Sequence, residues 1–306
     1  MTRDDEFLRT RLFPLLKEMA GFYTEFLTHK DADGKWIFTG SVSHENKPSN
    51  LNVSLLNNSS IDIAGAHFIF DTLFKAGEIL GEDVEQWRDF AAQLPDYRIN
   101  SDGALAEWAW PGLDDYYAHR HTSHLVGVWP YREITAGNSP LTAAAKRALD
   151  FRKQYQFGNN AGHGLLMGAL EYACLRDGKS CGELVRQLTA TDFYYDGLAT
   201  SHHGNHEVFC TDVVNTMPTI VMEMLVGSTD DTITLLPALP ASLGSGQLRG
   251  ILTRTGVKVE SMSWSGNGID CRLYSPRECS IEVIAPRESR RLDLGAASYT
   301  DIHFEI

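Results

Sequence analysis

The chain has 306 residues, enough for one large domain or for one domain with a smaller appendage. Its formal net charge of −13 disfavours nucleic acid and anionic membranes as partners. No apolar run approaches the ~20 residues that would span a bilayer. We therefore expect neither a nucleic-acid nor a membrane partner, and an uncharged substrate fits this balance.

The N-terminal residues and the cysteines carry little sign of export or of a metal centre. Residues 1–6 are polar and acidic, unlike a signal peptide, so the sequence leaves the cellular location unknown. The chain has five cysteines, an odd number, and no Cys-x-x-Cys pair. We expect reduced thiols, no metal site made of them and no cofactor.

Most of the chain before Gly227 shows a helical period. Between Phe7 and Leu27 the apolar residues recur every three or four positions, which predicts an amphipathic helix. Ser139-Pro140 supplies a cap and a first-turn proline for another helix. Pro218 is expected in the first turns of the last helix, where a missing amide is tolerated. The predicted helices span about 7–27, 61–80, 84–94, 140–154, 162–176, 180–188 and 212–225.

The pattern changes after Gly227. Short stretches that alternate or are β-branched, separated by turn residues, predict an antiparallel β-domain of about 75 residues. Helices first and strands last predict two modules, residues 1–227 and residues 228–306, with Leu235 to Pro240 packed at their join. The predicted strands lie at about 232–236, 248–253, 257–260, 269–273 and 281–284.

Residues 119–130 are the most unusual stretch. Three imidazoles and a guanidinium precede an apolar run that starts at Leu125, and polar rings beside a hydrophobic anchor are typical of a pocket wall. The alternative is a capped helix start with Ser123 near the N-cap. His121 and His124 could also bind a metal, but no carboxylate stands near them at ligand spacing, so we expect none.

The sequence His119-Arg120-His121-Thr122-Ser123-His124-Leu125-Val126-Gly127 resembles the His-Arg-His-x-Ser-His-Leu-x-Gly segment of glycoside hydrolase family 95. Members of that family are mostly inverting α-L-fucosidases. Further matches run in order from about residue 7 to about residue 260 and include Leu235-Leu236-Pro237-Ala238-Leu239-Pro240.

The resemblance implies a mainly α fold, the second half of an (α/α)6 barrel, followed by a small antiparallel β-domain. About seven helices are predicted where a closed barrel needs twelve. The resemblance therefore implies that the first half of the barrel is missing here, and that this N-terminal half or another copy of the chain completes it. We then expect the chain alone to expose a large apolar surface.

Glycoside hydrolysis without a cofactor usually needs two carboxyl groups, one as general acid and one as general base. Glu45 follows Ser41-Val42-Ser43-His44, which is similar to the Ser-x-Ser-x-Glu-Asn segment that holds the family's general acid, with His44 where a proline is common. The resemblance implies that Glu45 is the acid, with its pKa raised by shielding between His44 and Asn46. From the residues alone, an exposed loop glutamate is the alternative.

Asp212 is the second carboxyl that the resemblance points to. The family has Phe-x-x-Asp-Gly-Asn-Phe-Gly at the start of its last barrel helix, and Phe209 and Asp212 align with it, which implies that Asp212 is the base. Residues 213–216 depart from that pattern, as does His163, where Trp is usual. A helix N-cap is the alternative for Asp212. We expect Glu45 and Asp212 to face each other at roughly 6.5–9.5 Å, leaving room for a water.

The resemblance also implies a set of sugar-binding residues. His119, Arg120 and His121 match the family's pocket wall, and Glu107-Trp108 matches the Glu-Trp that precedes it. Trp108 could pack on a sugar face or fill the core.

The implied function is inverting hydrolysis of α-L-fucosides, or of closely related α-L-galactosides, at the ends of an oligosaccharide or glycan, without a cofactor. The alternative is an inactive or carbohydrate-binding remnant, because the Asn-x-Asn pair that positions the family's catalytic water lies in the missing half. Family members are often secreted or periplasmic.

Overall fold

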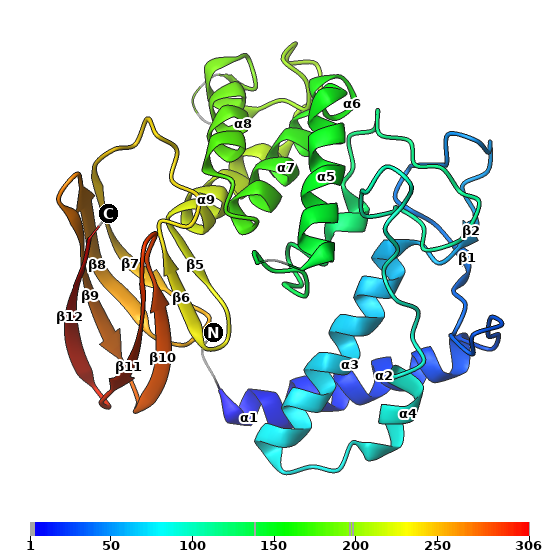
Figure 1. The fold of residues 1–306 in the computed structure, drawn as a ribbon, viewed down its shortest axis with the longest axis horizontal. Coiled ribbons are helices and arrows are strands. Elements are labelled where there is room, and N and C mark those ends of the chain that lie inside the picture. Colours follow the sequence, from blue (N-terminus) through cyan, green and yellow to red (C-terminus); the bar gives the residue numbers. More distant parts are fainter. Residues whose placement is uncertain (1–3, 138, 196, 198, 306) are drawn as a thin grey trace. The chain divides into compact units, whose positions relative to one another are not determined.

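The structure is a computed structural model that describes residues 4–137, 139–195, 197 and 199–305. The chain divides into two compact units that meet in the sequence between Asn159 and Asn160. Helices, loops and a short two-stranded sheet make up the first unit, whereas the second begins with helices and ends in strands (Figure 1). No described helix is both long and apolar enough to cross a bilayer.

In the first unit, α1 (Asp5–Phe7), the π-helical η1 (Leu8–Leu12) and α2 (Phe13–Phe26) form one continuous helical stretch, as the sequence predicts. The long helix α3 (Ser60–Leu80) packs against α2 (Figure 1) and buries Phe70 and Leu73 in a shared core. The other elements are β1 (Thr39–Ser41), β2 (Leu56–Asn57), η2 (Glu85–Trp87), α4 (Arg88–Ala91), η3 (Ser123–Leu125), α5 (Pro140–Gln154) and α6 (Gln156–Asn160).

A buried ion pair joins the helix α5 to the loops of this unit. Arg152 Nη2 donates to Glu107 Oε2 at 2.5 Å, and the side chains of Arg152 and Glu107 are 0% and 1% exposed. Burial alone would favour the neutral carboxyl. The charge of Arg152 and the hydrogen bonds that Glu107 accepts outweigh burial, so the pKa of Glu107 lies below its usual range.

The same pair holds loop segments that are far apart in the sequence. Ser43 Oγ and Asn46 Nδ2 donate to the two carboxylate oxygens of Glu107 at 2.6 and 2.7 Å. Arg152 Nη1 donates to the carbonyl oxygen of His119 at 3.3 Å. The loop that contains residue 45 and the segment around residue 119 are therefore fixed to one buried pair of charges.

In the second unit, α7 (Gly162–Cys174) packs against both α8 (Gly178–Ala190) and α9 (Thr211–Leu225), and a short hairpin of β3 (Tyr194–Tyr195) and β4 (Ala199–Thr200) precedes α9. Pro218 lies near the middle of α9, so its predicted place in the first turns is wrong.

The segment 235–240 lies between the strand at 232–235 and the strand at 246–252, and it packs against the helices. A Cβ atom at Gly182 of α8 would lie 2.8 Å from Pro240, so the helix approaches this segment closely. Leu236 N donates to the carbonyl oxygen of Leu225, the last residue of α9, at 2.8 Å. The segment therefore packs at the join between helices and strands, as the sequence predicts.

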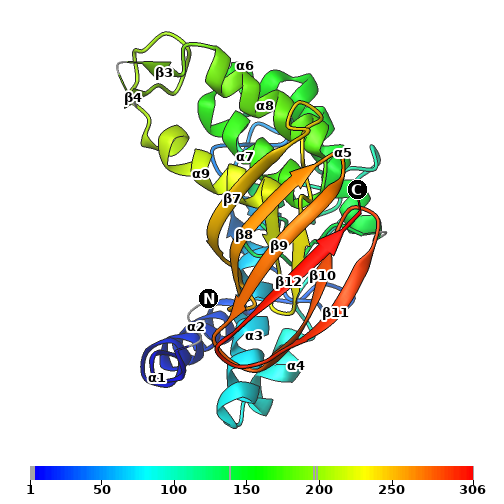
Figure 2. The same ribbon diagram turned by 90° about the vertical axis from the view of Figure 1, so that its left-hand side faces the viewer.

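The described strands that follow α9 form two four-stranded sheets that face each other (Figures 1 and 2). Their strand orders are β11-β10-β6-β5 and β12-β9-β8-β7. The expectation of a purely antiparallel domain is wrong at one place, because β6 and β10 pair in parallel. The strands are β5 (Val226–Ser228), β6 (Thr232–Leu235), β7 (Gly246–Leu252), β8 (Lys258–Ser265), β9 (Gly268–Ser275), β10 (Cys279–Ile284), β11 (Ser289–Leu294) and β12 (Ser298–Phe304).

We expect Arg152→Met to destabilise the protein by about 3–5 kcal/mol, because it leaves the buried charge of Glu107 without its partner. Urea unfolding followed by tryptophan fluorescence measures the loss. Asp301→Asn, which breaks the exposed Arg272–Asp301 pair, is the control and should leave the midpoint nearly unchanged. An equal effect of the two variants would contradict the special role of the buried pair.

Candidate active site

Glu45 occupies a tight turn that follows β1. The turn is closed by Asn46 N, which donates to the carbonyl oxygen of Ser43 at 3.0 Å. Glu45 itself has φ 52°, a left-handed conformation that non-glycine residues seldom adopt without support from their surroundings. Because the side chains of Ser43 and Asn46 are bound to buried Glu107, the side chain of Glu45 is left 55% exposed. The loop thus presents one carboxyl group to solvent.

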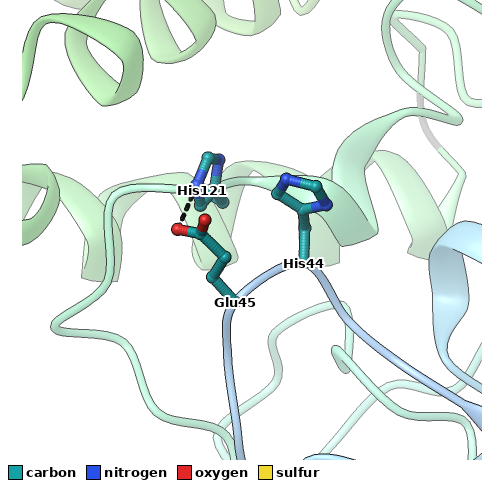
Figure 3. A group of neighbouring side chains, drawn as sticks. All are labelled: His44, Glu45 and His121. Atoms are coloured by element: carbon teal, nitrogen blue, oxygen red, sulfur yellow. Dashed lines mark hydrogen bonds and ion pairs between the residues drawn. The ribbon is translucent and has the colours of Figure 1, made fainter.

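Two side chains from a distant segment meet this carboxyl, and one of them, His121, is drawn in Figure 3. Arg120 Nη2 donates to Glu45 Oε2, and His121 Nε2 lies 3.3 Å from the same oxygen. The ring of His44 lies nearly perpendicular to that of His121, with centroids 4.8 Å apart. The structure therefore brings Glu45 together with the predicted residues Arg120 and His121.

The surroundings of Glu45 lower its pKa rather than raise it. The hydrogen bond from His121 contributes most, followed by the positive charge of Arg120. The expected shielding by neighbours is wrong, because Asn46 turns inward to Glu107 and leaves Glu45 open to water. In this arrangement Glu45 favours the carboxylate form.

His119 and His124 lie beneath this surface. Burial, with a further contribution from Arg152, lowers the pKa of His119, and its Nε2 atom is 3.1 Å from the carbonyl oxygen of His44. Burial lowers the pKa of His124 to about 4. Residues Ser123–Leu125 form the buried turn η3. The segment that starts at residue 119 therefore does two things: it packs in the core, and it holds Arg120 and His121 in place beside Glu45.

Gly158 fixes the backbone of this segment from the other side. It has φ +65°, and a Cβ atom there would lie 2.6 Å from the backbone nitrogen of Arg120. Neither the conformation nor the space suits a larger residue. The close approach of the left-handed turn in α6 therefore limits where Arg120 can lie.

Glu107 and Trp108 are each about 1% exposed, and both carboxylate oxygens of Glu107 are bonded to protein groups. The structure thus gives them a supporting role in place of the sugar contact predicted from the sequence. Sequence reasoning missed Arg152. A signal was present, since Arg152 falls on the apolar stripe that includes Ala145 and Leu149 of α5.

Asp212 lies in the first turn of α9, where the helix dipole favours a negative charge. Its Oδ2 atom is 3.3 Å from His163 Nδ1 at the start of α7. The two helix starts can come close because Gly162 has no side chain. A Cβ atom at this position would lie only 2.9 Å from Val213 Cγ2. Cys210 occupies the N-cap, so the alternative that Asp212 caps the helix is wrong.

A half-exposed carboxylate beside an imidazole can accept a proton from water. Glu45 belongs to the first compact unit and Asp212 to the second, and their predicted meeting across a shared surface stays a prediction.

The sequence matches two family models in succession. Residues 1–225 match the glycosyl hydrolase family 95 catalytic domain, and residues 227–297 match the glycoside hydrolase family 95 C-terminal domain. In its fold, the chain resembles a putative kojibiose phosphorylase from the human microbiome, with a TM-score of 0.57 at 10% identity, covering 98% of this chain and 44% of that one.

Two curated relatives are similar in sequence. Alpha-L-fucosidase 2 of Arabidopsis thaliana is 32% identical over an aligned length of 301 residues, and the match covers 92% of this chain and 35% of the relative. A probable alpha-fucosidase A of Aspergillus oryzae is 27% identical over an aligned length of 229 residues, and the match covers 66% of this chain and 31% of the relative. The chain thus spans about a third of the length of these relatives. From the matched domains and this identity, the chain belongs to glycoside hydrolase family 95.

Proposed function

We propose that the chain carries the acid and base of an inverting glycosidase that removes terminal α-L-fucose from oligosaccharides or glycans. The observation that carries the proposal is the strained turn that holds Glu45 outward against Arg120 and His121, in a chain of this family. The curated relatives are named as fucosidases, which supports the choice of sugar.

In the proposed reaction, Glu45 in its protonated form donates its proton to the leaving oxygen as the glycosidic bond breaks. Asp212 takes a proton from a water that attacks the anomeric carbon from the opposite face, so the product has inverted configuration. Arg120 and His121 donate hydrogen bonds to sugar hydroxyls.

The lowered pKa of Glu45 fits this scheme if the sugar changes the contacts of the carboxyl. When sugar hydroxyls accept the hydrogen bonds of Arg120 and His121, Glu45 loses the main causes of its lowered pKa. The sugar also displaces water from the exposed carboxyl, which favours the neutral form. Substrate binding therefore raises the pKa of Glu45 and prepares it to donate a proton.

We propose further that residues 1–227 are the second half of an (α/α)6 barrel and that residues 228–306 form the C-terminal β-domain. The free face of α2 supports this, since Leu15, Met19, Phe22 and Phe26 recur at helical spacing and are 36–56% exposed. Such an apolar stripe is suited to packing against another layer of helices.

Glu45→Gln and Asp212→Asn are each expected to lower kcat on an aryl α-L-fucoside by about 10²–10⁴-fold in an active form of the protein. The matched control is Asp270→Asn, which alters another exposed carboxylate bound to a histidine, His303. Unchanged turnover in Glu45→Gln would contradict the assignment. Parallel assays with an aryl α-L-galactoside decide between the two sugars, and sugar binding without turnover would favour the carbohydrate-binding alternative.

Arg120→Ala is expected to move the alkaline limb of the kcat/KM profile to higher pH. The guanidinium stabilises the carboxylate of Glu45, so its removal raises the pKa of Glu45 and keeps the acid protonated at higher pH. Arg120→Lys retains a positive charge and should leave the limb closer to that of the unaltered protein. A limb that stays in place or moves to lower pH in Arg120→Ala would show that Arg120 does not control the acid.

Residues 1–306 alone are expected to hydrolyse aryl α-L-fucosides little or not at all. The resemblance places the Asn-x-Asn pair that positions the attacking water in the first barrel half, and orienting that water is a large part of the barrier. Activity should appear when that half is supplied in cis or in trans. Robust turnover by the monomeric chain, unaffected by Asp212→Asn, would overturn both the completion of the barrel and the role of Asp212.

A further inference from the structure

The proposed acid lies within a group of three side chains that can bind a metal ion. His44, Glu45 and His121 each offer one ligand atom, and these atoms all lie within 4.8 Å of one another (Figure 3). The side chains of His44 and Glu45 are exposed and that of His121 is half-buried, so the group is open to an ion from solvent.

We propose that His44, Glu45 and His121 form a binding site for Zn²⁺. Two imidazole nitrogens and one carboxylate oxygen are a common set of protein ligands for zinc, with a fourth position left for water. Ligands at about 2.1 Å from a tetrahedral ion lie about 3.4 Å apart. The three ligand atoms lie within 4.8 Å of one another, so their side chains must draw closer together to reach that spacing around an ion.

The sequence gives no sign of this set. The pair considered there, His121 and His124, does not form a site because His124 is buried and points into the core. The sequence shows no carboxylate near His121 at the spacing of a metal ligand. In the structure Glu45 supplies this carboxylate, although it lies 76 positions before His121 in the sequence. The second imidazole comes from His44, its direct neighbour.

Arg120 opposes the cation without excluding it. Its guanidinium donates to Glu45 Oε2, and its positive charge repels a metal ion nearby. An ionised carboxylate has about four lone-pair positions on its two oxygens, so it can bind Arg120 and an ion together. Removal of this positive charge should therefore tighten zinc binding, an outcome that loss of a structural contact would not produce.

The consequence for catalysis rests on the proposed function. A zinc ion coordinated to Glu45 keeps it as a carboxylate and occupies the lone pair that must carry the proton. Zinc should therefore inhibit the glycosidase, and substrate should compete with zinc for the same surface.

Isothermal titration of the full chain with zinc chloride tests the site directly. His44→Ala and His121→Ala should each weaken binding at least about tenfold, since even second-shell changes cost that much. His303→Ala is the matched control, because His303 is also exposed and also contacts a carboxylate, that of Asp270, at 2.8 Å. Its affinity should equal that of the unaltered protein, and Arg120→Ala should bind more tightly.

An affinity that is the same in His44→Ala and His121→Ala as in the unaltered protein would overturn the site, as would the absence of binding at millimolar zinc. Circular dichroism confirms that the variants are folded, which is expected for the exposed His44. In the active form, zinc should inhibit the unaltered protein and spare His44→Ala, whose side chain has no role in the proposed reaction. Zinc binding without any fucoside turnover, even when the first barrel half is supplied, would leave the site intact and overturn the proposed function instead.

Discussion

The buried pair of Glu107 and Arg152 is the constraint on which the candidate site depends. Two charges without access to water need each other and further hydrogen bonds to offset the loss of hydration. Glu107 meets this need by accepting bonds from Ser43 and Asn46, the residues on either side of His44 and Glu45. Arg152 meets it in part through the carbonyl of His119. The requirement to satisfy one buried carboxylate therefore positions another carboxylate at the surface.

This arrangement explains why Glu45 adopts a left-handed conformation. Its neighbours are fixed inward, so the turn between them leaves Glu45 outward and close to Arg120 and His121. The hydrogen bonds of Ser43 and Asn46 to Glu107 offset the cost of this backbone conformation. Strained backbone that is stabilised by its surroundings in this way is often found at functional sites. Gly158 limits the Arg120 side of the same contact, since only a glycine fits against that backbone.

The sequence predicts the local parts of this fold well and the long-range parts poorly. The helical period and the Ser139-Pro140 cap correctly predict α2, α3 and α5. Both signals depend only on residues that are close together in the sequence. The parallel pairing of β6 with β10 has no local signal, as it depends on the path of the chain through the other sheet. The lowered pKa of Glu45 has no local signal either, because its two main causes, His121 and Arg120, lie 76 and 75 residues away in the sequence.

The two carboxyls of the proposed reaction differ in one respect that bears on their roles. Each has an imidazole nitrogen 3.3 Å away, that of His121 beside Glu45 and that of His163 beside Asp212. Glu45 has a guanidinium as well, which holds it ionised until another group takes that hydrogen bond. In the two proposals, a proton and a zinc ion compete for the carboxylate oxygens of Glu45. A sugar competes instead for Arg120 and His121, the hydrogen-bond donors that keep this carboxyl group ionised. In the proposed reaction, sugar binding therefore favours the proton over the proposed metal ion, and Glu45 becomes competent as the acid when the substrate binds.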